Sequence, residues 1–392
     1  MAEKPFDQAK LPRRIAVVGP VPPIRSGVAR HTAAVAFALA QNDHVELRTW
    51  SFRRQYPNWL YPGESEVAED AQAPEGLNVT WSLDGINPQS WHKTARDIRA
   101  WRPNLVILPA WTFFLAPALG WVARDLRRAG VECCVIVHNA FDHEDHNGTG
   151  WKARLSLWQL AQADRYVTHN EAIAKTLENH KPGIPVRVFP HPTFDDFPDP
   201  VGSLPREAGL ELLFFGLVRP YKGLDLAIEA LARSGRRDLR LTIAGEFWQG
   251  LEETRQDISR LGIGDQVELI PRHVSDAETA ELFDRADVVL LPYRSVTASG
   301  VIPVAYRYGR AVIASDLPGF SSVVKQGETG WLVPSEDIDA LSAILRGLDR
   351  SKTEAAGEKA LKLSAELSWE RFAELVLGSD LVASSGAKAG PA

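Results

Sequence analysis

Two cations stand three residues apart in a glycine-containing turn between an apolar strand and an amphipathic helix. The segment FFGLVRPYKGLDLAIEALA, residues 214–232, places Arg219 and Lys222 in this turn. The first turn of a helix has unpaired N–H groups and the positive end of the helix dipole, so cations added there favour a phosphate group. Taken alone, the segment predicts either a phosphate site or two solvated charges of a surface turn.

A second turn of this kind follows the first apolar strand, IAVVG. The next residues, PVPPIRSGVARHT, place Ser26 and Gly27 directly before a helix, where glycine lets a ligand approach the backbone closely. The alternative is a strand-to-helix turn that uses Ser26 as the helix N-cap. Since the turn contains neither GxGxxG nor GxxxxGKS/T, it supports neither a dinucleotide fingerprint nor a P-loop.

A third candidate turn lies in residues 287–334, which are predicted to run strand, polar glycine loop, helix, strand and loop. Thr297 and Ser299 precede the helix, and the amides of Gly300 and Val301 open it, so an anion could bind there as well. Three such turns at one cleft favour a diphosphate ligand over three unrelated helix caps.

A histidine and a cluster of titratable residues follow the strand VECCVIVHN. His138 ends the strand, and the cluster in the next loop comprises Asp142, His143, Glu144, Asp145 and His146. Their spacing matches neither HExxH nor a Cys/His zinc pattern, which favours a hydrogen-bonding loop over a preformed metal site. His138 is interpreted as a substrate contact, because the carboxyl ends of strands bind ligands in α/β sheets; a strand-end histidine with a structural hydrogen bond is the alternative.

Alternating strands and helices must position these turns. Residues 12–195 contain the apolar strands IAVVG, VELRTW, NLVILP, CCVIV, RYVTH and VRVFP, separated by helical patterns. Residues 209–365 repeat the alternation with ELLFFG, LRLTIAG, QVELI, DVVLLPY and AVIAS, and with helices beginning near Leu224, Leu251, Ala277 and Gly300. Such alternation predicts parallel sheets covered by helices.

The predicted fold is therefore α/β, with two doubly wound Rossmann-like domains facing each other across a cleft that binds the ligand. Residues 196–208 are interpreted as a linker, because this region is rich in Pro, Asp and Gly and has no hydrophobic period. Residues 366–378 form a predicted terminal helix, and residues 379–392 a predicted disordered tail.

Composition sets the broad class. The 392 residues exceed the usual size of one core, and the net charge of −6 gives no reason to expect nucleic-acid binding. The sequence shows no signal peptide and no apolar run long enough to span a membrane, so a cytoplasmic protein is expected. Cys133 and Cys134, the two cysteines, are adjacent and are interpreted as buried thiols.

Six blocks together resemble retaining GT-B glycosyltransferases of family 4, and the resemblance runs from Arg13 to about Leu377. The blocks are GPVPPIRSGVARHT, VHNAFDHE, FFGLVRPYKGLDLAIEAL, LTIAGEFW, ADVVLLPYRSVTASG to AVIASDLPGF, and ETGWLVP. ELSWERFAELVL also resembles the family's terminal helix, which returns toward the N-terminal domain. The resemblance implies transfer of a hexose-type sugar from a nucleotide diphosphate to an acceptor hydroxyl with retention of anomeric configuration.

The resemblance also implies roles for single residues. Arg219 and Lys222 would neutralise the leaving diphosphate, and His138 would contact the donor sugar. The other residues implied on the donor side are Gly27, Glu246, Arg272, His273, Gly300 and Val301. Ser26, Asp142 and Glu144 are assigned to the acceptor side. Neither a metal nor a cofactor is required in this interpretation, since the cations and helix amides supply the charge stabilisation.

The chain departs from the family pattern at two carboxylates. The first Glu of the EX7E motif corresponds to Thr297, and the second falls near Val304 or Ala305. Thr297 and Ser299 are therefore expected to replace the carboxylate as sugar ligands, as in a subgroup with RPYKG and SxTxSG-type loops. The missing Glu residues also leave open a sugar-nucleotide-binding pseudoenzyme or partner subunit. A nucleotide-sugar epimerase is a third alternative.

One segment rich in aromatic and basic residues could bring the protein into peripheral contact with a membrane. Its members are Trp50, Phe52, Arg53, Arg54, Tyr56, Trp59 and Tyr61. They either form a loop that receives a lipid-linked acceptor at the inner face of a membrane or pack into the core. The expected partners are a nucleotide sugar and an acceptor glycan, lipid-linked glycan or small molecule, and no nucleic acid.

Overall fold

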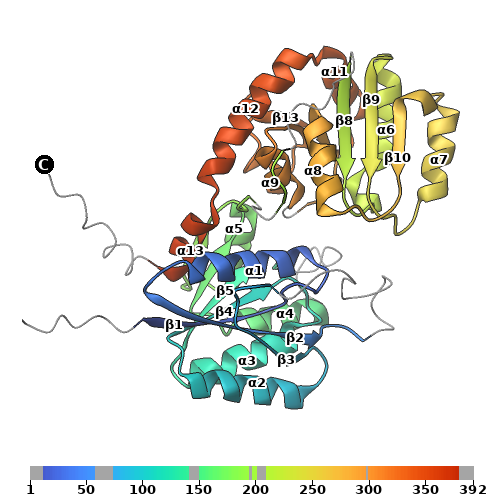
Figure 1. Ribbon diagram of the computed structural model, residues 1–392. Coiled ribbons are helices and arrows are strands. Elements are labelled where there is room, and N and C mark those ends of the chain that lie inside the picture. Colours follow the sequence, from blue (N-terminus) through green and yellow to red (C-terminus); the bar gives the residue numbers. More distant parts are fainter. Residues whose placement is uncertain are drawn as a thin grey trace, which may run out of the picture. The chain divides into compact units, whose positions relative to one another are not determined.

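The structure is a computed structural model that describes residues 12–57, 74–140, 150–193, 197–200, 209–296 and 299–378. The chain divides into two compact units, whose elements are labelled in Figure 1. The N-terminal unit comprises the chain up to residue 169, residues 173–189 and the chain from residue 369 onward; the C-terminal unit comprises residues 170–172 and 190–368.

A parallel sheet forms the centre of the N-terminal unit. In the described part of the chain its strands are β1 (Arg13–Val18), β2 (Val45–Arg54), β3 (Val79–Asp84), β4 (Leu105–Ala110), β5 (Glu132–Val137), β6 (Arg165–Thr168) and β7 (Val186–Val188). They lie in the order β3-β2-β1-β4-β5-β6-β7. The strand order reverses between β1 and β4, and α/β sheets bind ligands at the carboxyl ends of strands flanking such a point.

Helices cover both faces of this sheet. They are α1 (Gly27–Ala40), α2 (Pro88–Trp101), α3 (Ala116–Arg128), α4 (Trp151–Leu160), α5 (Glu171–His180) and α13 (Trp369–Leu377). α2 and α3 lie against one face, and α1 lies on the other, where it packs against α13 (Figure 1). The last helix of the chain is therefore part of the N-terminal unit.

The C-terminal unit contains a second parallel sheet. Its described strands are β8 (Leu210–Phe215), β9 (Leu239–Ala244), β10 (Val267–Ile270), β11 (Val288–Leu291), β12 (Ala311–Ser315) and β13 (Gly330–Val333), in the order β10-β9-β8-β11-β12-β13. The order reverses between β8 and β11. Both sheets thus have the doubly wound arrangement that the sequence predicts.

Helices also accompany the C-terminal sheet. The described helices are η1 (Pro220–Lys222), α6 (Leu224–Ser234), α7 (Leu251–Arg260), η2 (Gly264–Gln266), α8 (Asp276–Arg285), α9 (Val301–Arg307), α10 (Pro318–Ser321), α11 (Ile338–Gly347) and α12 (Arg350–Glu366). The four helices predicted near Leu224, Leu251, Ala277 and Gly300 are confirmed within one residue of their starts.

The strands can be predicted from the sequence where helices cover both faces of the sheet. Every residue of β4 and of β12 is buried, so these strands appear in the sequence as continuous apolar runs. β3 is not predicted, because VTWSLD mixes polar and apolar residues at the edge of its sheet. β13 falls in a stretch predicted as loop, and it is a strand because it pairs with β12.

The division between the units falls between Phe189 and Pro190 rather than after residue 195. Hydrogen bonds explain why this segment belongs to the C-terminal unit. The backbone N–H of Thr193 donates to the carbonyl of Leu367 at 2.9 Å, and its hydroxyl donates to the carbonyl of Ser364 at 2.9 Å.

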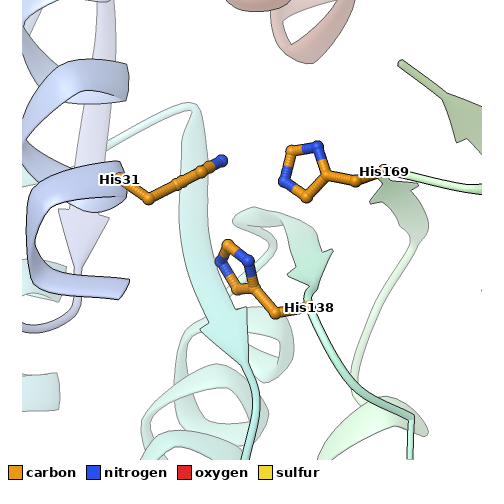
Figure 2. Close-up of side chains that lie close together, drawn as sticks. All are labelled: His31, His138 and His169. Carbon is orange, nitrogen blue, oxygen red and sulfur yellow. The ribbon is translucent and has the colours of Figure 1, made fainter. Parts of the chain in front are cut away.

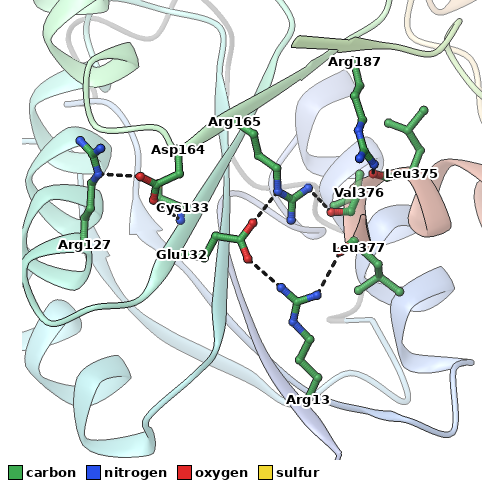
Figure 3. A network of polar contacts seen from close by, with 10 residues as sticks. All are labelled: Arg13, Arg127, Glu132, Cys133, Asp164, Arg165, Arg187, Leu375, Val376 and Leu377. Atoms are coloured by element: carbon green, nitrogen blue, oxygen red, sulfur yellow. Dashed lines mark hydrogen bonds and ion pairs between the residues drawn. The ribbon is translucent and has the colours of Figure 1, made fainter. Parts of the chain in front are cut away.

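Arginine side chains anchor the carboxyl end of α13 to the sheet. Three of them donate to its last carbonyl groups (Figure 3): Arg13 to Leu377 at 3.0 Å, Arg187 to Leu375 at 3.0 Å, and Arg165 to Val376. Glu132 pairs with both Arg13 and Arg165 at 2.7 Å. Cations suit this position because the last carbonyls of a helix lack partners within the helix and form the negative end of its dipole.

The aromatic segment at residues 50–61 is divided between core and surface. Trp50 and Phe52 are 2% and 1% exposed, so the membrane-facing interpretation is wrong for these two residues. Both belong to the buried core of the N-terminal unit, and Thr49 and Ser51 beside them on β2 are buried as well, because helices cover both faces of this sheet. Arg53 and Arg54 are exposed, whereas Trp59 and Tyr61 lie outside the described residues.

The two cysteines are free and fully buried, as expected. Burial raises the pKa of the Cys134 thiol to about 11, so both side chains serve as small apolar groups of β5. Among the described helices, none combines the length and apolar character needed to cross a membrane.

Candidate functional site

The carboxyl edge of the C-terminal sheet gathers most of the predicted donor-side residues. Arg219 and Lys222 follow β8, Glu246 follows β9, and Arg272 follows β10. Ser299 follows β11. Since all these strands are parallel, their carboxyl ends meet along one edge, and β8 and β11 flank the point where the strand order reverses.

A tight turn sets the position of Lys222. Gly223 has a φ of 65°, and a Cβ atom there would lie 2.1 Å from the carbonyl oxygen of Pro292, so only glycine fits. A Cβ atom built on Gly216 would lie 3.3 Å from Nζ of Lys222. The ammonium group therefore lies above the end of β8, and it is 5.6 Å from the ring centre of Tyr293, which follows β11.

Lys222 is a buried cation. Lys222 is 8% exposed. Burial, together with the nearby charge of Arg219, lowers the pKa of its ammonium group to about 8. No carboxylate among the described residues pairs with it. A buried ammonium without a counter-ion costs free energy, which an anionic ligand would recover.

Arg219 lies beside this cation on an aromatic ring. Its guanidinium carbon is 3.7 Å from the ring centre of Trp248, a cation–π contact with a side chain that is 41% exposed. Its Nε is buried and has no hydrogen-bond partner among the described residues. Stacking fixes the plane of the guanidinium and leaves this donor available for an oxygen ligand.

A backbone hydrogen bond joins Glu246 to the turn that contains Arg219. The N–H of Val218 donates to the carbonyl of Glu246 at 2.8 Å, while the Glu246 side chain is exposed. Arg272 and His273 are exposed at the end of β10. Arg272 pairs with Glu278 at 2.6 Å, and Glu278 also closes the capping box of α8, so the structure gives Arg272 a structural partner.

A serine hydrogen bond closes the turn before α9, whose N-cap residue is Gly300. The hydroxyl of Ser299 accepts a hydrogen bond from the amide of Val301 at 3.3 Å, and Gly300 is exposed beside it. Thr297 lies outside the described residues. Val304 and Ala305, which align with the missing second carboxylate, are 3% and 0% exposed on the buried side of α9.

One bracing residue is missed by sequence reasoning. The backbone N–H of Arg294 donates to the carbonyl of Tyr221 at 2.7 Å, and its guanidinium donates to the carbonyl of Pro220 at 2.9 Å, so Arg294 holds the start of the η1 turn. It also pairs with Asp225 at 2.5 Å. Burial alone would raise the pKa of Asp225, but the hydrogen bonds and charge of Arg294 lower it overall. Nothing in the spacing of Arg294 signals this long-range contact.

The turn between β1 and α1 has the expected cap and an open glycine. The hydroxyl of Ser26 accepts from the amide of Ala29 at 3.0 Å, which is the N-cap alternative for this residue. A Cβ atom on Gly27 would meet nothing within 4 Å. The described surroundings of Gly27 therefore leave space for a ligand at the backbone.

His138 is half-buried directly after β5, and it belongs to a cluster of three histidines. His31 on α1 and His169 directly after β6 lie beside it (Figure 2), with ring centres 4.5 Å and 5.3 Å from that of His138. Sequence reasoning misses His31 and His169. Their positions in GVARHT and at the end of RYVTH place both near the carboxyl edge, which is the available signal. Asp142 and Glu144 lie outside the described residues.

Each unit matches a family of known proteins. Residues 25–194 match the family model described as "Glycosyltransferase Family 4", and residues 209–349 match "Glycosyl transferases group 1". Among curated relatives, the chain is similar to D-inositol 3-phosphate glycosyltransferase of Mycobacterium marinum, with 26% identity over 68% of this chain and 61% of the relative. The corresponding protein of Geodermatophilus obscurus is 30% identical over 68% of this chain and 64% of the relative. The matches thus span less than two thirds of these relatives.

Solved structures resemble the chain over nearly its whole length. Sucrose-phosphate synthase from Thermosynechococcus elongatus has a TM-score of 0.71 at 19% identity, covering 96% of this chain and 100% of that structure. Anabaena HepE in complex with UDP has a TM-score of 0.69 at 15% identity, covering 95% and 100%. At such identity the likeness concerns the fold. The chain therefore has the GT-B fold, and each of its two domains matches a glycosyltransferase family model.

Proposed function

We propose that this chain is a glycosyltransferase that moves a hexose-type sugar from a nucleotide diphosphate to an acceptor hydroxyl. The observation that carries the proposal is the buried ammonium of Lys222, which stands beside Arg219 at the reversal point of the C-terminal sheet without a carboxylate partner among the described residues. The matches to two glycosyltransferase family models support it.

The proposed chemistry places negative charge at this pair of cations. The bond between the anomeric carbon and the diphosphate oxygen breaks, and its electron pair stays on the diphosphate. The acceptor oxygen bonds to the anomeric carbon, and its proton passes to the departing phosphate. Lys222 and Arg219 stabilise the leaving group more strongly in the transition state than in the bound donor, because negative charge develops on the diphosphate as the bond breaks and the ammonium of Lys222 is buried.

Retention of the anomeric configuration follows from the family resemblance, with attack and departure on the same face of the sugar. His138 and Gly27 are proposed to contact the donor, and Ser26, Asp142 and Glu144 the acceptor side. Thr297 and Ser299 take the place of the missing carboxylate. No metal is invoked, since Lys222 and Arg219 can neutralise the diphosphate themselves.

The relatives suggest which substrates to try first. HepE structures are described with UDP and with UDP-glucose, and the curated relatives are named D-inositol 3-phosphate glycosyltransferases. UDP-hexoses are therefore the first donors to test. A polysaccharide, a glycolipid or a glycosylated metabolite is the proposed product.

Product analysis with a radiolabelled nucleotide sugar tests the function. Sugar transferred to an acceptor supports the proposal. Binding without turnover would instead support a pseudoenzyme, which the absence of carboxylates at Thr297, Val304 and Ala305 motivates. Release of an epimerised free nucleotide sugar would contradict both interpretations.

Variants of the two cations test the assignment of the leaving-group site. Arg219→Ala and Lys222→Ala are each expected to reduce kcat by about 10²–10³, or about 3–4 kcal/mol, because each removes a charge that acts on the leaving group. Arg255→Ala on α7 and Lys325→Ala are matched controls, since both side chains are exposed. Near-normal turnover in both Arg219→Ala and Lys222→Ala would contradict the assignment of these residues to the leaving-group site.

A further inference from the structure

Three histidine rings from distant parts of the sequence meet in the N-terminal unit. His31 comes from α1, His138 follows β5, and His169 follows β6 (Figure 2). One ring nitrogen of each lies within 4.8 Å of the corresponding nitrogens of the other two. Imidazole is the commonest protein ligand for divalent transition metals, so this convergence is a candidate metal site.

Burial and hydrogen bonding prepare these rings for coordination. His31 and His169 are 1% and 3% exposed, and the Nε2 atoms of all three rings are buried. Nδ1 of His169 lies 3.1 Å from the carbonyl oxygen of Phe189. Because a carbonyl only accepts, Nδ1 carries the proton in this contact, and in the neutral ring the lone pair is then on Nε2 of His169, on the side of the other two rings (Figure 2). Metal-binding histidines have this arrangement in most known sites.

The spacing suits a small ion after a modest contraction. Three atoms no more than 4.8 Å apart lie within a circle whose radius is at most 4.8 Å divided by the square root of three, about 2.8 Å. Zinc–nitrogen bonds measure about 2.0–2.1 Å, so each ring would move inward by about 0.7 Å. Rotation about the side-chain torsions of three histidines can supply a shift of this size.

We propose that His31, His138 and His169 bind one divalent transition-metal ion of the zinc class, with a solvent-derived fourth ligand. The cluster contains no carboxylate among the described residues, so an ion bound by three neutral rings and a solvent ligand keeps a net positive charge, which lowers the pKa of a bound water. His138 is the half-buried member, which gives the fourth ligand access from its side.

Such an ion would connect α1 to the ends of β5 and β6. It would also hold α13 in place indirectly, because the rings of Trp369 and Phe372 pack on His31 at 4.9 Å and 5.5 Å between centres. The metal site does not depend on the proposed transfer reaction. His138 is common to both, so metal occupancy is expected to withdraw it from the donor sugar.

Metal binding is measured on the full-length chain without a polyhistidine tag. Zn²⁺ is titrated against a chromophoric chelator, and Co²⁺ is used for its visible ligand-field absorption. One ion per chain and a tetrahedral Co²⁺ spectrum are expected. X-ray absorption of the Zn²⁺-loaded wild type should show three imidazole ligands, a result that needs no variant to fold. Sub-stoichiometric binding, or fewer than three imidazoles, would overturn the proposal.

Variants then locate the ion. His31→Ala and His169→Ala are expected to weaken Zn²⁺ binding at least about 100-fold and to remove the rise in Tm that Zn²⁺ gives the wild type. His180→Ala, at an exposed position on α5, should bind like the wild type. His143→Ala/His146→Ala, in the segment outside the described residues, should also leave binding unchanged. Loss of binding in either control, or its retention in both cluster variants, would overturn the assignment.

Discussion

Replacing Lys222 by methionine should stabilise the protein while weakening its ligand binding. The ammonium group is buried without a carboxylate among the described residues, and methionine is one heavy atom shorter, so it fits the same space. A residue kept for folding would show the opposite effect. Lys222→Met therefore separates a functional charge from a structural one.

The size of the effect follows from the pKa of Lys222. Burial lowers this pKa from 10.5 to about 8. Each pKa unit corresponds to about 1.4 kcal/mol, so the charged lysine destabilises the folded state by about 3 kcal/mol at pH 7. The penalty is fully present below pH 8, and it fades between pH 8 and 10.5, where the unfolded chain holds more protons than the folded one.

Thermal unfolding at several pH values measures this penalty. At pH 7 the Tm of the C-terminal unit should rise by about 6–12 °C in Lys222→Met, and the difference from wild type should shrink toward pH 10. Lys325→Met, an exposed lysine of the same unit, should change Tm by less than about 2 °C at either pH. A lower Tm in Lys222→Met, or a gain that is equal at both pH values, would refute the reasoning.

Two further predictions concern the same turn. The affinity for a nucleoside diphosphate should fall about fivefold between pH 8 and pH 9 in the wild type, because the protonated form of Lys222 binds and its pKa is about 8. Calorimetric titration should show a flat profile in Lys222→Met, and a matching fall in that variant would contradict this cause. Arg294→Ala should weaken nucleoside diphosphate binding about tenfold although Arg294 is not proposed to contact the ligand, because the substitution removes the guanidinium that holds the carbonyl of Pro220 and the carboxylate of Asp225. Arg294→Lys should restore part of the affinity, and wild-type affinity in Arg294→Ala would contradict this role.

The sequence predicts elements and residues whose roles depend on local order along the chain. Strands such as β4 and β12 are buried on both faces and form apolar runs, and Arg219 and Lys222 follow directly after such a strand. The carboxyl edge of a parallel sheet then brings together turns that are far apart in sequence. For this reason the fold could be predicted, and so could the position of Arg219 and Lys222 at the end of β8, whereas their role stays a prediction.

The parts that could not be predicted depend on distant contacts. Arg294 braces a turn 74 residues away, and Trp248 stacks on Arg219 from the turn after β9. The ring of His31 on α1 lies 4.5 Å from that of His138 after β5 and 4.9 Å from that of His169 after β6, measured between ring centres. The spacing of these residues along the chain does not predict such long-range contacts, so a structure is needed to find them.

The central claim is that Arg219 and Lys222 bind the diphosphate of the donor. Its most direct test compares the Kd values of uridine, UMP and UDP for the wild type and for Lys222→Met, with Lys325→Met as the control. The account predicts that the affinity gained from UMP to UDP in the wild type and the control is lost in Lys222→Met, by about 10²-fold for a buried charge-assisted contact. Equal Kd values for UDP in the wild type and Lys222→Met would contradict it.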